Sequence, residues 1–182
     1  HTEETVIQVS RGVVTTDQDQ YSADLVVSAL DAGVLERLMG HTRPDPQNLS
    51  CSGIAVFTAL KENLPPDTVT HSVVLPDDPH DLFDSVLSRR FPRQTMSFVN
   101  YYRTGHIYPN EKATAAFLLA APANGQVADV SDEWVQSELQ RAVDVMGLDA
   151  AWSDLVEDYQ VLHPDYFASF GATGGALYGA GR

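Results

Sequence analysis

The order of the apolar segments constrains the fold of this chain more than any other feature of the sequence. Three short β-rich runs follow one another near the start, at residues 5–9, 12–16 and 20–29. The turn sequences Ser-Arg-Gly and Asp-Gln-Asp separate them. Short strands joined by such turns pair with their sequence neighbours, so this region is predicted to be an antiparallel meander.

The rest of the chain mixes strand and helix patterns without regular βαβ alternation. Strand-like runs occupy residues 52–61, 68–75, 95–102, 112–121 and 157–163. Apolar residues at helical spacing, with N-cap or proline start signals, occupy residues 78–90, 131–147, 150–155 and 164–169. This order predicts an α+β fold, in which flanking helices cover a mixed, largely antiparallel sheet. The first two of these strand-like runs are candidates for a hairpin with a long loop.

The run at residues 20–29 ends in the continuous apolar sequence Leu25-Val26-Val27. A continuous apolar run is typical of a strand that is buried on both faces of a sheet. Asp31 is a suitable N-cap for a helix that begins directly afterwards, and Gly40 is a suitable end for it. Nucleotide-binding sheets use this kind of strand-to-helix junction, yet no glycine-rich phosphate loop accompanies it here.

Charge and composition exclude several classes of partner. The chain has 11 Lys and Arg against 25 Asp and Glu, a net charge of −14 at pH 7, which disfavours nucleic acid and anionic lipid surfaces. Its apolar runs are too short for a membrane span. The single cysteine, Cys51, favours a reducing compartment, so we expect a cytoplasmic protein. The chain begins at His1 without a signal-like segment, from which we expect a trimmed start.

No short motif of catalysis or metal binding is present in the sequence. The glycine-rich end, GATGGALYGAGR, matches neither the dinucleotide nor the P-loop spacing, and it has no evident packing pattern. The six histidines are scattered, so we expect no metal site. The acidic pairs Asp77-Asp78 and Glu157-Asp158 stand at the ends of predicted elements, where capping and solvation explain them. We therefore assign no catalytic residue.

Large apolar side chains gather on the predicted strands, and alternation divides them between two faces. The candidates for contact with an apolar ligand are Phe57, Met96, Phe98 and Tyr101. Two interpretations remain open. Helices cover both faces of the sheet, or one face stays uncovered and lines a tunnel for a long apolar molecule.

Six segments, taken in order, carry a resemblance to a known family. They are SADLVVSALDAGVLERLMG, SCSGIAVFTAL, HSVVLPDDPHDLFDSVL, FPRQTMSFVNYYRTGHIYPNEKATAAFLLAAPANG, EWVQSELQRAV and HPDYFASFGATGGALYG. In this order the chain resembles the middle and late part of phytoene desaturase-like proteins. These are carotenoid dehydrogenases and isomerases of the FAD-dependent amine oxidase superfamily. The resemblance covers nearly the whole chain, as segment order and diffuse pattern rather than as one sharp signature.

The resemblance implies three parts with different roles. Residues 1–40 would be a remnant of an FAD-binding domain, with a meander, a returning strand and a short helix. Residues 41–170 would be the substrate-binding domain, and residues 171–182 a glycine-rich tail leading back toward the FAD domain. The family's GxGxxG motif has no counterpart in this sequence. By position, Ser28, Ala29 and Asp31 would stand near the flavin.

The implied function is that of a fragment of a flavin-dependent oxidoreductase, a desaturase or isomerase of carotenoid biosynthesis, that acts on a long apolar polyene. The parent protein would hold FAD and make peripheral contact with a membrane, while the isolated chain would be inactive and prone to self-association. The alternative is a non-enzymatic carrier of an apolar ligand, or a protein-interaction module, that uses the same apolar sheet face.

Overall fold

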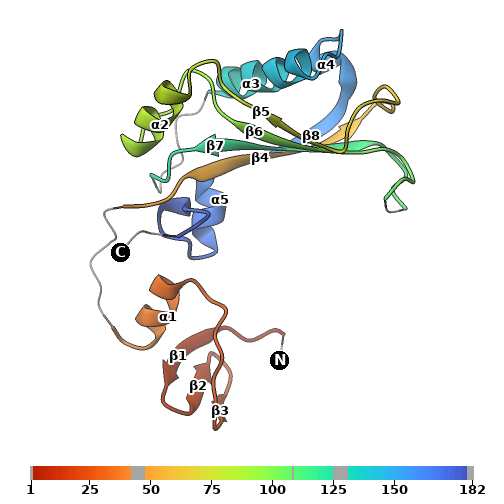
Figure 1. Ribbon diagram of the computed structural model, residues 1–182. Helices are drawn as coiled ribbons and strands as arrows, with labels where there is room; N and C mark the ends of the chain where they lie inside the picture. Colours follow the sequence, from red (N-terminus) through yellow and green to blue (C-terminus); the bar gives the residue numbers. More distant parts are fainter. Residues whose placement is uncertain (1, 42–47, 108, 125–130, 180–182) are drawn as a thin grey trace.

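The computed structural model describes residues 2–41, 48–107, 109–124 and 131–179, and these contain two separate sheets (Figure 1). Every strand pair in them is antiparallel, and helices flank the larger sheet. The predicted α+β class is therefore confirmed.

The first sheet is the predicted meander. It has the order β1-β2-β3, formed by β1 (Val6–Ser10), β2 (Val13–Thr16) and β3 (Gln20–Ser22). Gly12 has a φ of 75° in the turn between β1 and β2, a conformation that suits glycine because it has no Cβ. Among residues 2–41 only Thr16 is buried, so this part of the chain has no apolar core of its own.

The strand β3 is shorter than the run of residues 20–29 predicted from the sequence. The strand ends at Ser22, and residues 23–30 form neither strand nor helix. Leu25 is 78% exposed and Val27 is 84% exposed, where a strand buried on both faces was expected. The apolar pattern predicts a strand, but a strand also needs a neighbouring strand that supplies backbone hydrogen bonds, and no described strand pairs with residues 25–27. The helix that follows, α1 (Ala32–Leu38), does begin as predicted, because the Asp31 carboxylate accepts a hydrogen bond from Gly33 N at 2.9 Å.

The second sheet has five strands in the order β5-β6-β7-β4-β8. They are β4 (Ser52–Leu60), β5 (His71–Val74), β6 (Ser97–Tyr102), β7 (Thr114–Ala121) and β8 (Val156–Leu162). The hairpin suggested between residues 52–61 and 68–75 does not form, since β4 pairs with β7 and β8, and β5 pairs with β6. The nearly continuous apolar sequence of β4 is suited to an interior position, whereas the short and more polar β5 lies at an edge.

Three helices lie against one face of this sheet or at its end: α2 (Pro79–Leu87), α3 (Asp132–Val145) and α4 (Trp152–Leu155) (Figure 1). Ser131 caps α3 as the sequence predicts, by accepting a hydrogen bond from Trp134 N at 3.2 Å. The apolar stripe of α3 faces the sheet, and its buried members are Val135, Leu139, Ala142 and Val143. These side chains form one core with the strand residues Ile54, Val56, Val99, Phe117 and Leu119.

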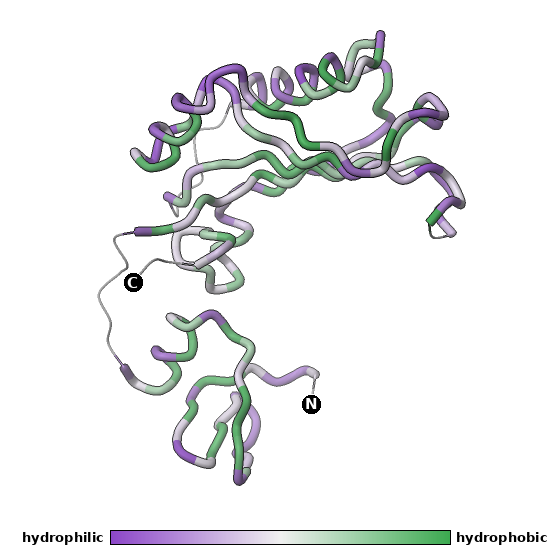
Figure 2. Tube along the Cα trace, in the orientation of Figure 1, coloured by the Kyte–Doolittle hydropathy of each residue, from purple (hydrophilic) through white to green (hydrophobic). Residues whose placement is uncertain are grey.

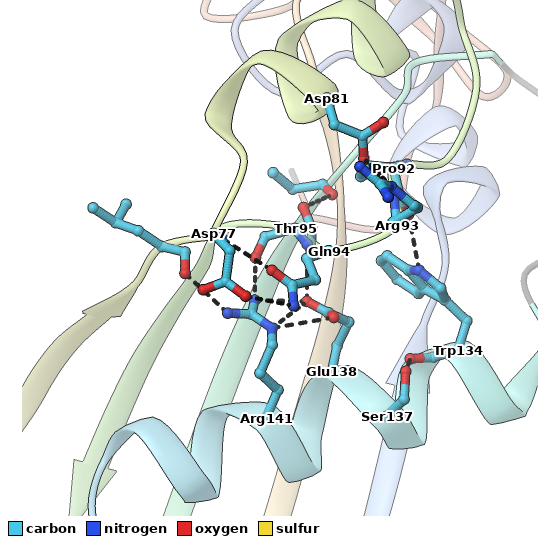
Figure 3. Close-up of polar contacts among 12 residues, drawn as sticks. Asp77, Asp81, Pro92, Arg93, Gln94, Thr95, Trp134, Ser137, Glu138 and Arg141 are labelled. Atoms are coloured by element: carbon cyan, nitrogen blue, oxygen red, sulfur yellow. Dashed lines mark hydrogen bonds and ion pairs between the residues drawn. The ribbon is translucent and has the colours of Figure 1, made fainter.

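A polar contact also joins α3 to the sheet (Figure 3). Thr95, two residues before the start of β6, donates its backbone N–H to the Glu138 carboxylate at 2.9 Å. Arg141 donates to the backbone oxygens of Leu75 and Thr95. The two charged side chains thus bind backbone groups next to β5 and β6, which fixes the position of the helix on the sheet.

The C-terminal residues lie against the other face of the sheet, at the β4 end that begins at Ser52. They form α5 (Pro164–Ser169) and the 3₁₀ turn η1 (Thr173–Gly175), both in contact with β4 (Figure 1). Leu177 N donates to Cys51 O at 3.0 Å, and Ala176 is buried. The prediction that this end has no packing pattern was wrong for residues 171–179, while residues 180–182 lie outside the described part.

Candidate functional site

The sheet face opposite α3 is uncovered over much of its area, and we call it the open face. Its outward side chains come from β4, β6, β7 and β8, and those used below are Phe57, Ala59, Phe98, Tyr102, Thr114, Ala116, Asp158 and Gln160. Phe57 is 51% exposed and Phe98 is 39% exposed. Beside Phe57 the open face has a hollow of about 470 Å³, with lining from β4, β6, β7 and β8.

Strand alternation explains why these residues share a face. On β4 the side chains of Val56 and Thr58 point toward α3 and are buried, while Phe57 between them points away. On β7 the burial alternates through all eight residues, with Phe117 on the covered face and Ala116 on the open face. Figure 2 colours the chain by hydropathy and shows both apolar and polar residues along these strands.

The C-terminal segment covers only one end of the open face. Gly53 lies there, and a Cβ atom at this position would stand 2.7 Å from Leu118 Cδ1 and 3.1 Å from Leu177 Cδ1. The glycine therefore allows Leu177 to pack closely on the sheet. Helices α3 and α4 cover one face of the sheet, and the described residues cover the second face only at this end, with α5 and η1 (Figure 1).

The four ligand-contact candidates do not all meet on this face. Phe57 and Phe98 lie on it, in adjacent rows of the sheet. Met96 directly precedes β6 and shares the alternation of Phe98, but it is half-buried at the covered end, where its carbonyl oxygen accepts a hydrogen bond from Ala120 N. Tyr101 lies on the covered face, buried in the core, and its hydroxyl accepts a hydrogen bond from Leu64 N at 3.0 Å. The assignment of Tyr101 as a wall residue is therefore corrected.

Several residues of the open face were not singled out from the sequence. Tyr102 stands next to Tyr101 and points to the opposite side, so alternation from Phe98 would have selected it. Ala116 follows from the same rule on β7. Gln160 and Asp158 were not accessible to this reasoning, because the sequence does not indicate that β8 pairs with β4.

Of the residues expected near a flavin, Ser28 and Ala29 are exposed and Asp31 is partly buried. Ser28 and Ala29 lie in the exposed segment before α1, and the Ser28 hydroxyl accepts a hydrogen bond from Leu30 N at 3.2 Å. The Asp31 carboxylate is engaged in capping α1. These three residues stand together in sequence, and Arg37 lies near Asp31, since a Cβ at Gly33 would be 3.2 Å from Asp31 Oδ1 and 3.7 Å from Arg37 Nη1.

Three glycines of the glycine-rich segment do not offer a phosphate cradle, because atoms of the chain itself occupy the space that their missing side chains leave. A Cβ at Gly171 would stand 2.4 Å from Val34 Cγ2, one at Gly174 2.6 Å from Leu49 Cδ1, and one at Gly175 2.4 Å from Pro164 O. At these three glycines the described residues therefore do not fit the pyrophosphate of FAD.

Several titratable side chains of the described residues have capping or ion-pair partners. No three His, Cys, Asp or Glu side chains in this part of the chain stand where they could hold a metal ion. Asp78 caps α2 through His80 N and Asp81 N, and Lys112 pairs with Glu157. Burial raises the pKa of the half-buried Cys51 thiol, which disfavours the reactive thiolate.

Comparison with known proteins adds no identification. No family model matches the chain, and no curated protein matches its sequence. In the described residues, no helix has the length and apolar character needed to cross a bilayer.

Proposed function

We propose that this chain is the substrate-binding part of a flavin-dependent oxidoreductase that acts on a long apolar polyene, and that the open face binds the polyene. The observation that carries the proposal is the uncovered sheet face itself. Phe57 and Phe98 are exposed on one side of a sheet whose other side packs against α3, and Phe57 lines a hollow of about 470 Å³. An exposed apolar face next to such a hollow is typical of a ligand-binding surface.

The segment order that resembles phytoene desaturase-like proteins supports the polyene as the ligand class. In such an enzyme the flavin supplies the redox chemistry, while residues of this kind bind and orient the substrate and exclude water. Because Gly171, Gly174 and Gly175 leave no room for a pyrophosphate, we place the pyrophosphate-binding groups of the enzyme outside the described residues. The exposed Leu25 and Val27 are consistent with a strand that pairs with another part of that enzyme.

A fluorescent polyene gives a direct test of the open face. A double variant, Phe57→Ala and Phe98→Ala, should weaken the binding of a conjugated polyene to the purified chain by about tenfold or more. The loss of each ring removes apolar area that would contact the polyene. Phe83→Ala is the matched control, because Phe83 is also an exposed phenylalanine but lies on α2, away from the open face. Equal binding by the double variant and the control would contradict the proposal.

The flavin part of the proposal has a separate test. The purified chain should bind no FAD, and a yellow protein with stoichiometric flavin would show that these residues hold the cofactor after all. The alternative function, a carrier of an apolar ligand or an interaction module, is favoured by the lack of fit to FAD. An adjoining GxGxxG sequence in the same reading frame would favour the enzyme, and its absence from the encoded protein would favour the carrier.

A further inference from the structure

The polarity of the open face changes along its strands. Cross-strand neighbours form rows that run across the sheet, and the strand register defines them. The row next to the covered end is entirely apolar, with Val73, Phe98, Leu118, Ala55 and Leu162. The following row keeps an apolar centre between polar flanks, and it holds His71, Asn100, Ala116, Phe57 and Gln160.

The last row is polar around a single small residue. It holds Tyr102, Thr114, Ala59 and Asp158. The hollow of about 470 Å³ extends over this row and the one before it, so the hollow is apolar toward Phe57 and polar toward Asp158. A ligand that lies along the strands therefore meets an apolar surface with most of its length and polar side chains with one end.

The polar end is suited to a neutral group that donates hydrogen bonds. Asp158 brings a carboxylate, of which Oδ1 accepts a hydrogen bond from Tyr159 N at 2.9 Å. Its other oxygen has no donor among the described residues. No lysine or arginine lines the hollow, and the chain as a whole carries a net charge of −14. A carboxylate or phosphate on the ligand would be repelled here, whereas a hydroxyl can donate to Asp158.

From this juxtaposition of Phe57 with Asp158 we propose that the ligand of the open face is an elongated apolar molecule that ends in a neutral hydroxyl group. The hydroxyl lies in the polar row and the apolar chain extends over Phe57 and Phe98. The inference deepens the proposed function and rests on it, because it specifies the chemistry of the molecule that the open face binds.

The test compares two fluorescent probes with the same conjugated polyene chain, one a terminal alcohol and the other the corresponding carboxylic acid. At low ionic strength the alcohol should bind at least about fivefold more tightly than the acid. This is the effect expected when the carboxylate of the acid lies about 4 Å from the Asp158 carboxylate in a water-like dielectric. Added salt should reduce the difference, because it screens exposed charges.

Two variants separate the local effect from the overall charge. Asp158→Asn should bring the affinities of the two probes close together. Asp154→Asn removes the same charge from α4, on the other side of the sheet, and should leave the preference for the alcohol as it is.

The outcomes distinguish this inference from the proposed function. If the acid binds as tightly as the alcohol, or if Asp158→Asn leaves the preference unchanged, the hydroxyl ligand is overturned while the open face stands as a binding surface. If neither probe binds, the proposed function fails and this inference fails with it.

Discussion

Glu138 and Arg141 form an ion pair of 2.7 Å, one turn apart on α3, with only 3% of the Glu138 side chain exposed. Both partners also bind backbone: Glu138 accepts from Thr95 N, and Arg141 donates to Leu75 O and Thr95 O. Figure 3 shows that these contacts converge where the chain enters β6. A buried charge of this kind is tolerated because its hydrogen-bonding capacity is filled.

Removal of one partner of this pair should therefore be costly. Glu138→Ala should lower the free energy of unfolding by about 3 kcal/mol, since it removes the anionic partner of the partly buried Arg141 guanidinium and leaves the buried Thr95 N–H without its acceptor. Chemical denaturation checks this. Glu133→Ala, in the exposed first turn of the same helix, is the control. It should change the free energy of unfolding by at most about 0.5 kcal/mol. Similar losses in both variants would show that the ion pair does not fix α3.

The contact between Val34 of α1 and Gly171 should depend on the missing Cβ. Gly171 has a φ of 91° and Gly179 a φ of 75°, so alanine is strained at both, by about 1 kcal/mol. Only at Gly171 would the new methyl meet Val34, at 2.4 Å, whereas nothing lies within 4 Å at Gly179. Gly171→Ala should therefore cost about 1–3 kcal/mol more than Gly179→Ala in thermal or chemical unfolding.

A second substitution tests the cause of that difference. Val34→Ala in the Gly171→Ala background should recover part of the lost stability, because it removes the methyl groups that clash. If no stability is recovered, the contact between α1 and the C-terminal segment does not carry the effect.

The first sheet contains a tyrosine with an altered titration. The hydrogen bond to the Glu4 carboxylate, from Oη to Oε1 at 2.7 Å, raises the pKa of Tyr21 to about 12. The hydrogen bonds from Tyr21 and Thr16 in turn lower the pKa of Glu4. The contribution of Tyr21 to stability is thus present below its ordinary pKa of 10.0 and lost as the pH rises through about 12.

The contribution of Glu4 to stability has the opposite pH dependence. Its pKa lies below the ordinary 4.5 in the folded chain, so its contribution is present above that value and lost as the pH falls through the folded pKa. In an absorbance titration of tyrosinate, Glu4→Gln should lower the pKa of Tyr21, while Glu3→Gln should not. The difference between the wild type and Tyr21→Phe isolates the signal, and an unshifted Tyr21 in the wild type would contradict the hydrogen bond.

The exposed segment before α1 should promote association. Leu25 and Val27 are largely exposed, and residues 2–41 have no apolar core, so we expect this segment to bind an apolar dye and to favour oligomers of the isolated chain. The double variant Leu25→Ser and Val27→Ser should reduce both dye fluorescence and oligomer content. Leu87→Ser, at an equally exposed leucine of α2, is the control. Dye binding that falls equally in the two variants would argue against a special role for the segment.

Local patterns predicted most of the elements and the division of residues between faces. The meander, the capped helix α3 and the strands β4, β6 and β7 were expected close to their observed bounds, because turn residues, caps and alternation act within a few residues. The same alternation places Phe98 and Tyr102 on one face. The same alternation places Tyr101 on the covered face, and it is buried in the core there, so its prediction as a wall residue was wrong.

The sequence by itself determined which residues can share a face of a strand or helix and where most elements begin, because those properties depend on backbone geometry and near neighbours. Only the tertiary structure decided that β8 lies beside β4, that α3 and α4 leave one face of the sheet uncovered, and that Gly171 receives Val34. The exposed Leu25-Val26-Val27 run shows the limit most clearly: its sequence has the character of a buried strand, but strand pairing requires hydrogen-bonding partners distant in sequence, and no local pattern specifies them.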